Sequence, residues 1–127
     1  MPQERGLPMT AGALLDGNEI YAHTSVRGDL APELHPVVLR FFNALPAQER
    51  ERFTGWCAEA SLVSDQLYAA QAAGQQVTAT TARAVLWGTK IRVTRVREAG
   101  DPAHGTSQPP CRSCAALLDW FGVEVLP

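Results

Sequence analysis

Three cysteines, held in two segments far apart in the sequence, are the feature that says most about how this chain folds. Cys57 opens a Cys-x-Glu run at 57–59, and Cys111 and Cys114 belong to a Pro-Cys-x-x-Cys run at 110–114, some fifty residues later. An odd number of cysteines without a secretory signal argues against a disulfide framework, and clustered thiols outside such a framework are typical metal ligands or redox groups. If all three serve one site, the fold must bring the segment around residue 57 against the segment around residue 111.

Length and composition are those of one globular domain. A chain of 127 residues, 46% of them hydrophobic, is long enough to bury one core but too short for two. We therefore expect a single domain over 1–127, with a loose segment at 1–10. No apolar run approaches the roughly 18 residues that span a bilayer, so we expect no membrane partner. The first residues lack the apolar stretch of a signal peptide, which predicts a cytoplasmic protein, or one delivered into a target cell by another route.

Hydrophobic periodicity and turn residues predict alternating strands and helices. An Asp-Gly-Asn turn at 16–18 is typical of a hairpin, Thr78 is a helix cap, and Leu62, Val63 and Leu67 form one apolar stripe. Trp87 and Trp120 each end an apolar helical stripe, so we expect both in the core. The expected strands cover 11–15, 19–25, 90–97 and 123–126, and the expected helices cover 37–45, 57–73, 78–87 and 111–121. This mixed order predicts a layered α/β fold, with helices packed on a mixed sheet.

The spacing of the cysteines suits an open zinc site. Zinc prefers tetrahedral sulfur and nitrogen ligands, and a catalytic zinc keeps one position free for water. Cys111 and Cys114 are three residues apart at the start of a predicted helix, so their sulfurs share one face, and the helix N-terminus favours thiolates. Glu59 is two residues after Cys57, about 200° round a helix, so it points elsewhere and can act as a proton shuttle instead of a ligand.

Other interpretations of these residues remain open. A lone Cys-x-x-Cys is also typical of a redox pair, and a closed structural zinc site is possible with His23, His35 or His104 as the fourth ligand. A basic stretch also has two interpretations, because no acidic residue occurs between Asp65 and Glu98. It is either a solvated strand edge protected by positive charge or a surface that binds polyanions. The net charge of −2 gives the second interpretation no support. The basic residues are Arg83, Lys90, Arg92, Arg95 and Arg97.

The two cysteine motifs together resemble the zinc-deaminase signature, in which a histidine usually stands where Cys57 stands here. More specifically, the chain resembles the YwqJ-like deaminases of bacteria, members of the cytidine-deaminase-like superfamily that often occur as toxin domains. The resemblance runs from about residue 19 to the C-terminus. Four segments carry it: Thr-Ser-Val-Arg-Gly at 24–28, Leu-His-Pro at 34–36, Gly-Trp-Cys-Ala-Glu at 55–59 and Pro-Cys-Arg-Ser-Cys at 110–114.

The resemblance implies a cytidine deaminase-like three-layer sandwich, a Zn²⁺ cofactor and a nucleobase substrate in nucleic acid or a nucleotide, with cytosine-type bases favoured. It also implies an immunity protein as a partner if the chain is a toxin effector domain. A biosynthetic enzyme acting on a nucleoside or small metabolite, and a non-catalytic zinc-stabilised interaction domain, are the alternatives.

Roles for individual residues follow from the same resemblance. By position, Cys57, Cys111 and Cys114 are the expected zinc ligands, and Glu59 is the expected proton shuttle. The backbone at Ala58 is expected to hold the substrate carbonyl, and Ser25 and Arg27 are expected to contact substrate. Because three thiolates carry more negative charge than two thiolates and a histidine, they make zinc a weaker Lewis acid, and we expect the reaction to depend more heavily on Glu59.

Overall fold

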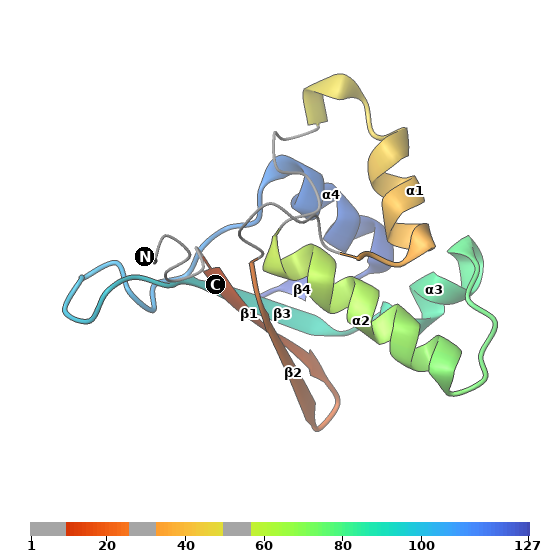
Figure 1. Ribbon diagram of the computed structural model, residues 1–127, viewed down its shortest axis with the longest axis horizontal. Coiled ribbons are helices and arrows are strands. Elements are labelled where there is room, and N and C mark those ends of the chain that lie inside the picture. Colours follow the sequence, from red (N-terminus) through yellow and green to blue (C-terminus); the bar gives the residue numbers. More distant parts are fainter. Residues whose placement is uncertain (1–9, 26–32, 50–56) are drawn as a thin grey trace.

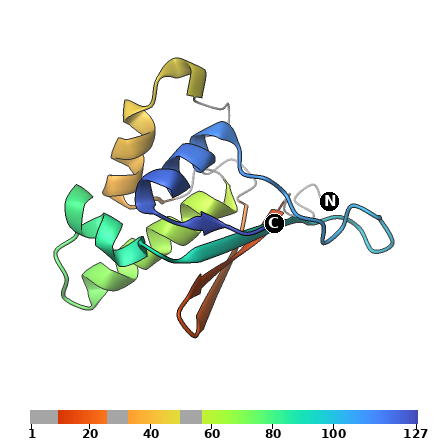
Figure 2. The same ribbon diagram turned by 180° about the vertical axis from the view of Figure 1, so that it is seen from behind.

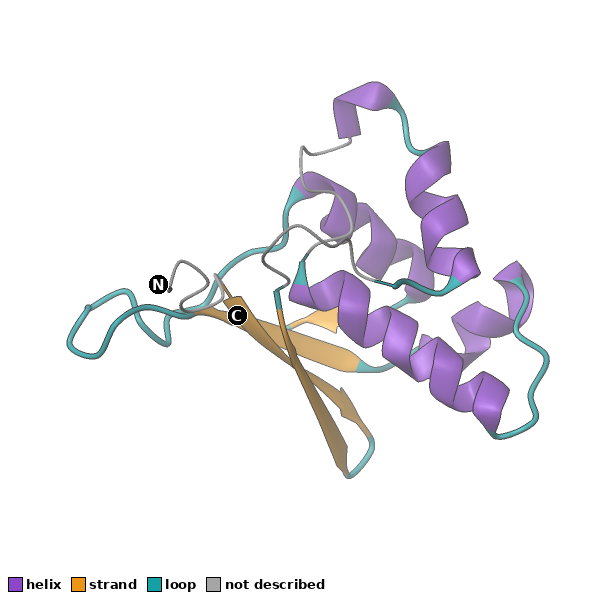
Figure 3. Cartoon of the chain, viewed as in Figure 1, coloured by secondary structure: helices purple, strands orange, loops and turns teal. Residues whose placement is uncertain are grey.

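A computed structural model describes residues 10–25, 33–49 and 57–127, and in these residues four strands form one sheet with helices packed on it (Figures 1 and 3). None of the described helices is long and apolar enough to cross a membrane. The strands are β1 (Thr10–Asp16), β2 (Glu19–Thr24), β3 (Lys90–Arg95) and β4 (Glu124–Val125). The helices are α1 (Pro36–Ala44), the 3₁₀ turn η2 (Ala47–Glu49), α2 (Ala58–Ala72), α3 (Ala79–Leu86) and α4 (Arg112–Phe121).

The sheet has the order β2-β1-β3-β4 and is mixed. β1 pairs antiparallel with both β2 and β3, whereas β3 pairs parallel with β4. The predicted hairpin between β1 and β2 is confirmed: Asp16 pairs with Glu19, and Gly17 takes a φ of 61°, which glycine adopts without strain. The parallel pair requires a long connection between β3 and β4, and this connection contains α4.

The two faces of the sheet differ in burial. Leu14, Ile91 and Val93 are buried on the face that carries the helices, while Lys90 and Arg92 are exposed on the other. The front and back views agree that the labelled helices all lie on one side of the strands (Figures 1 and 2). The predicted α/β fold, with helices packed on a mixed sheet, is therefore confirmed.

α2 is the central helix of this packing. It contacts β1, β2, α1, α3 and α4, and Leu62, Val63 and Leu67 are fully buried as the periodicity predicted. The expectation of one apolar stripe is too narrow, however, because every residue from Ala58 to Ser64 is buried. Small alanine and serine side chains allow this helix to be enclosed on more than one side in its first two turns.

Glycine at position 12 brings α2 close to the sheet. A Cβ atom added there would lie 3.0 Å from Leu62 Cδ1, 3.3 Å from Ala58 Cβ and 3.5 Å from Val93 Cγ2. The missing side chain of Gly12 therefore allows the first turn of α2 to approach the middle of β1. This contact fixes where Cys57 and Glu59 lie relative to the sheet.

The helix boundaries differ from the predictions by at most one residue, and the caps explain most of the differences. Cys57, Thr78 and Cys111 are N-cap residues and not the first helical ones. Thr78 and Thr81 form a reciprocal capping box. α1 begins at Pro36, one residue before its predicted start, since proline is well suited to the first helical position.

β3 was expected to continue to Arg97, but it ends at Arg95, and the chain continues as an arm, defined here as residues 96–107. The Arg95 N–H donates to Thr106 O at 2.8 Å, and the Gln108 N–H donates to Val93 O at 2.8 Å. The arm extends away from the helices, and the chain returns from it to α4 (Figure 1).

The basic stretch does not protect a sheet edge, because β3 lies between β1 and β4. Four of its five cations instead donate a side-chain hydrogen bond to a main-chain carbonyl of the chain itself: Arg83, Arg92, Arg95 and Arg97. Lys90 is exposed on the open face of the sheet. Binding of a polyanion to this stretch stays a prediction.

The expectation that Trp87 is a core residue is wrong. Its side chain is 63% exposed, and its ring covers Gly122, where an added Cβ would lie 2.2 Å from a ring carbon. The Arg83 guanidinium carbon lies 5.5 Å from the centroid of the Trp87 ring and 5.1 Å from that of Trp120. Trp87 thus caps a surface stack with an arginine between two tryptophans.

Candidate metal centre

The fold brings the three cysteines together, as the sequence required. Their Sγ atoms all lie within 4.8 Å of one another, and those of Cys57 and Cys111 are 3.6 Å apart. In a tetrahedral centre with Zn–S bonds of about 2.3 Å, two sulfurs are separated by about 3.8 Å. The spacing and the chemistry of these three donors therefore fit a zinc ion.

Two helix N-termini position the sulfurs. Cys57 caps α2 and Cys111 caps α4, and each accepts the first helical hydrogen bond on its carbonyl, from Ser61 and Ala115 respectively. α2 and α4 are in contact, and the sulfurs of their N-cap residues, Cys57 and Cys111, lie side by side. Because both helix dipoles place positive charge at these caps, the site favours thiolates.

The three thiols share protons unequally. The pKa of Cys111 lies well below its usual range, because the thiols of Cys114 and Cys57 donate hydrogen bonds to its sulfur. The bond to Cys111 also raises the pKa of Cys57 to about 12, and it raises the pKa of Cys114. In the metal-free cluster, Cys111 is therefore the thiol that loses its proton most readily.

Glu59 is a buried carboxyl at the edge of this cluster. The residue is 3% exposed on the first turn of α2. Burial raises the pKa of Glu59. A hydrogen bond from its own backbone N–H lowers this pKa in part, and the negative sulfur of Cys111 raises it further. Glu59 in turn raises the pKa of Cys57 and Cys114, so it lies within electrostatic reach of all three sulfurs. A carboxyl that holds a proton easily beside a metal-ligand cluster is suited to acid–base chemistry.

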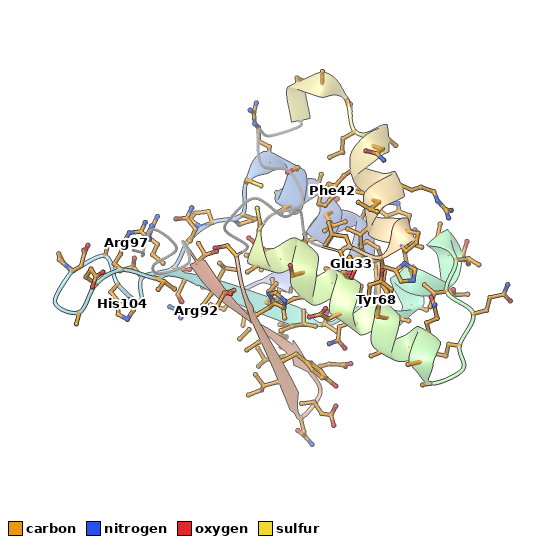
Figure 4. The ribbon with its side chains drawn as sticks, in the orientation of Figure 1. Glu33, Phe42, Tyr68, Arg92, Arg97 and His104 are labelled. Atoms are coloured by element: carbon orange, nitrogen blue, oxygen red, sulfur yellow. The ribbon has the colours of Figure 1, made fainter. Side chains whose placement is uncertain are left out.

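The histidines do not join the sulfurs in the described part of the chain, where the cluster consists of the three cysteines alone. His35 caps α1, with its Nδ1 accepting from the Val37 N–H and its Nε2 bonded to Gln71 Oε1. His23 Nδ1 lies 2.8 Å from a main-chain carbonyl. His104 accepts the Arg97 N–H, and both lie on the arm, away from α2 and α4 (Figure 4). A closed site with one of these histidines as the fourth ligand therefore has no support.

The predicted substrate contacts have different outcomes. Ala58 is fully buried at the first position of α2, where helical N–H groups have no partner within the helix. Ser25 follows β2, and its Oγ accepts the Thr10 N–H at 3.1 Å, so it closes the end of the β1–β2 pair. Arg27 lies outside the described residues. The roles of all three in binding substrate stay predictions.

The structure adds one further residue to the neighbourhood of the sulfurs. Ser113, between the two paired cysteines, is fully buried, and its Oγ lies 3.3 Å from the Cys111 sulfur. Its position inside Cys-x-x-Cys was visible, but the direction of its side chain depends on the start of α4. Arg112, its neighbour, is exposed.

Comparison with known proteins gives the family. The model of the YwqJ-like deaminase family matches residues 1–123 of the chain. No curated protein and no solved structure matches it. The family match covers the hairpin, the Cys-x-Glu run and the Pro-Cys-x-x-Cys run together. The chain belongs to the YwqJ-like deaminase family.

Proposed function

We propose that this protein is a zinc-dependent deaminase that hydrolyses the exocyclic amine of a nucleobase, of the cytosine type, in nucleic acid or a nucleotide. One observation supports this most: the buried Glu59 carboxyl lies within electrostatic reach of three sulfurs whose spacing fits a zinc ion. Cys57, Cys111 and Cys114 would hold the metal. When bound, zinc supplies Lewis acidity that makes a water easier to deprotonate.

Glu59 carries the protons of the reaction. Its carboxylate takes a proton from the attacking water, and the water oxygen bonds to the amidine carbon of the base. Glu59 then gives this proton to the ring nitrogen, takes the remaining proton of the added hydroxyl and passes it to the exocyclic amine. The carbon–nitrogen bond breaks, which releases ammonia and leaves the oxo base. The raised pKa of Glu59 suits it to both holding and returning a proton.

The packing around α2 supports the same role. The first two turns of α2 are enclosed on several sides, so the Glu59 carboxyl is shielded from bulk water. The N–H group of Ala58, at the start of α2 where such groups have no partner within the helix, would bind a substrate carbonyl. Gly12 holds this turn against the sheet and so keeps acid, metal ligands and N–H groups in one arrangement.

A direct test is to measure zinc content and then incubate the loaded protein with single-stranded DNA, RNA and free nucleotides. Mass spectrometry of the nucleosides and an ammonia assay report deamination. We expect about one zinc per chain and a new oxo base in at least one pool. Product from free nucleotides alone would identify a metabolic enzyme. Bound zinc without product from any pool would contradict catalysis and favour an interaction domain.

The proposal extends to a role as a toxin effector domain. Expression of the wild-type chain inside a bacterium should then arrest growth, and Glu59→Gln should not. An equal growth defect from both forms would contradict a toxic effect that depends on deamination.

A further inference from the structure

Ser113 lies inside the metal-binding run but has no assigned role. It is the second residue of α4, between Cys111 and Cys114, and it is 0% exposed. Its Oγ lies 3.3 Å from Cys111 Sγ, within hydrogen-bonding distance for a sulfur acceptor. The start of α4 thus turns this hydroxyl toward the cluster while the neighbouring Arg112 is exposed.

The direction of this hydrogen bond follows from the chemistry of the ligand. A cysteine that binds zinc does so as a thiolate, which has no proton to donate. The hydroxyl of Ser113 must therefore be the donor and Cys111 Sγ the acceptor. We propose that Ser113 is a positioning residue that orients the Cys111 thiolate and reduces its negative charge through an O–H···S hydrogen bond. This inference rests on the proposed zinc site.

Such a donor has a particular use in a three-thiolate centre. Three thiolates and a divalent cation leave a net charge of −1 in a largely buried place, which favours protonation of the ligands over metal binding. A hydrogen bond to sulfur stabilises the thiolate and withdraws electron density from it. Ser113 thereby stabilises the loaded centre and restores part of the Lewis acidity that the replacement of histidine by Cys57 removes.

The test compares Ser113→Ala, Ser113→Thr and a matched control, Ser61→Ala, in the full chain. Ser61 is 4% exposed on α2 and supplies the same loss of a buried hydroxyl one turn from a different ligand. Zinc affinity is measured by competition with a chromophoric chelator. The sulfur-to-metal charge-transfer band of the cobalt-substituted protein reports the electron density on the thiolates, independently of activity.

Ser113→Ala should weaken zinc binding about 10-fold and move the cobalt band to lower energy, because the freed thiolate is richer in electrons. Ser113→Thr keeps a hydroxyl and should keep the wild-type band, and Ser61→Ala should change neither readout. Zinc affinity within twofold of wild type and an unmoved band in Ser113→Ala would overturn the inference. If Ser113→Ala does not fold, the cobalt band of Ser113→Thr decides the question. A Ser113→Thr band shifted from that of the wild type would refute the hydrogen bond to Cys111. A wild-type chain that binds neither metal would instead overturn the proposed function.

Discussion

Glu59→Gln should make the metal-free protein more stable while it removes catalysis. The Glu59 carboxyl is 3% exposed, and burial raises its pKa, so at neutral pH the fold must either bury a charge or keep a proton that the unfolded chain has lost. Glutamine has the same shape and never ionises. We expect a gain of about 1 kcal/mol in the free energy of unfolding, or about 4 °C in Tm for a chain of this length. Catalysis should fall about 10²- to 10⁴-fold, because the proton shuttle is lost.

The dependence of this gain on pH follows from the sign of the shift. A carboxyl whose folded pKa is raised binds more protons in the folded state than in the unfolded state between the two pKa values, so wild-type stability falls as pH rises through this window. Below the unfolded value of about 4.3 both states are protonated and the penalty vanishes. The advantage of the glutamine variant should therefore be present at about pH 8 and absent at about pH 4.

Urea unfolding of chelator-treated protein at both pH values measures this difference. Glu124→Gln makes the same chemical change at an exposed position of β4, and it should alter stability by less than about 0.5 kcal/mol. A Glu59→Gln variant that is less stable than wild type at the higher pH, or whose advantage does not change with pH, would refute the description of Glu59 as a buried carboxyl under a desolvation penalty.

Three further outcomes test the packing and the cluster. Gly12→Val should destabilise the protein by about 1–3 kcal/mol in urea unfolding, because the new side chain meets α2. Ala13→Val, on the open face of the sheet, should not destabilise it. Equal effects of the two variants would contradict the close approach of α2 to β1. Arg83→Ala should cost about 1–2 kcal/mol and change tryptophan emission, since it removes a cation between two indole rings; unchanged emission would argue against the stack. Zinc binding should release about two protons per metal, because the raised pKa values of Cys57 and Cys114 keep both thiols protonated before binding. Calorimetry in buffers of different ionisation enthalpy measures this release. Release of no proton would mean that the metal-free cluster is already fully ionised.

Much of the fold could be predicted because its signals are local. The turn around Gly17 and the cap at Thr78 each depend on a few neighbouring residues, and both are present as expected. The start of α1 at Pro36 was misjudged for a similar local reason, since proline both ends loops and begins helices. Boundaries elsewhere differ by a residue or two, because a cap lies half inside its helix.

Solvent exposure was harder to predict than secondary structure. Trp87 ends an apolar stripe, yet it lies on the surface over Gly122 because α3 stops where the chain turns toward β3. The basic stretch was interpreted from charge alone, but the carbonyls that Arg83 and Arg92 bind come from segments far along the chain. Such partners depend on tertiary contacts and leave no periodic pattern in the sequence.

The sequence by itself determined which residues have the chemistry of a metal centre: three cysteines in two motifs, with a glutamate two positions after the first. Residue type and spacing suffice for this, because ligand preference and helix geometry are local properties. Only the tertiary structure decided that the sulfurs meet within 4.8 Å, that Glu59 is buried within electrostatic reach of them, and that Ser113 turns toward Cys111. These features depend on the packing of α2 against α4 and the sheet, and burial, pKa and hydrogen-bond partners arise only when that packing removes water.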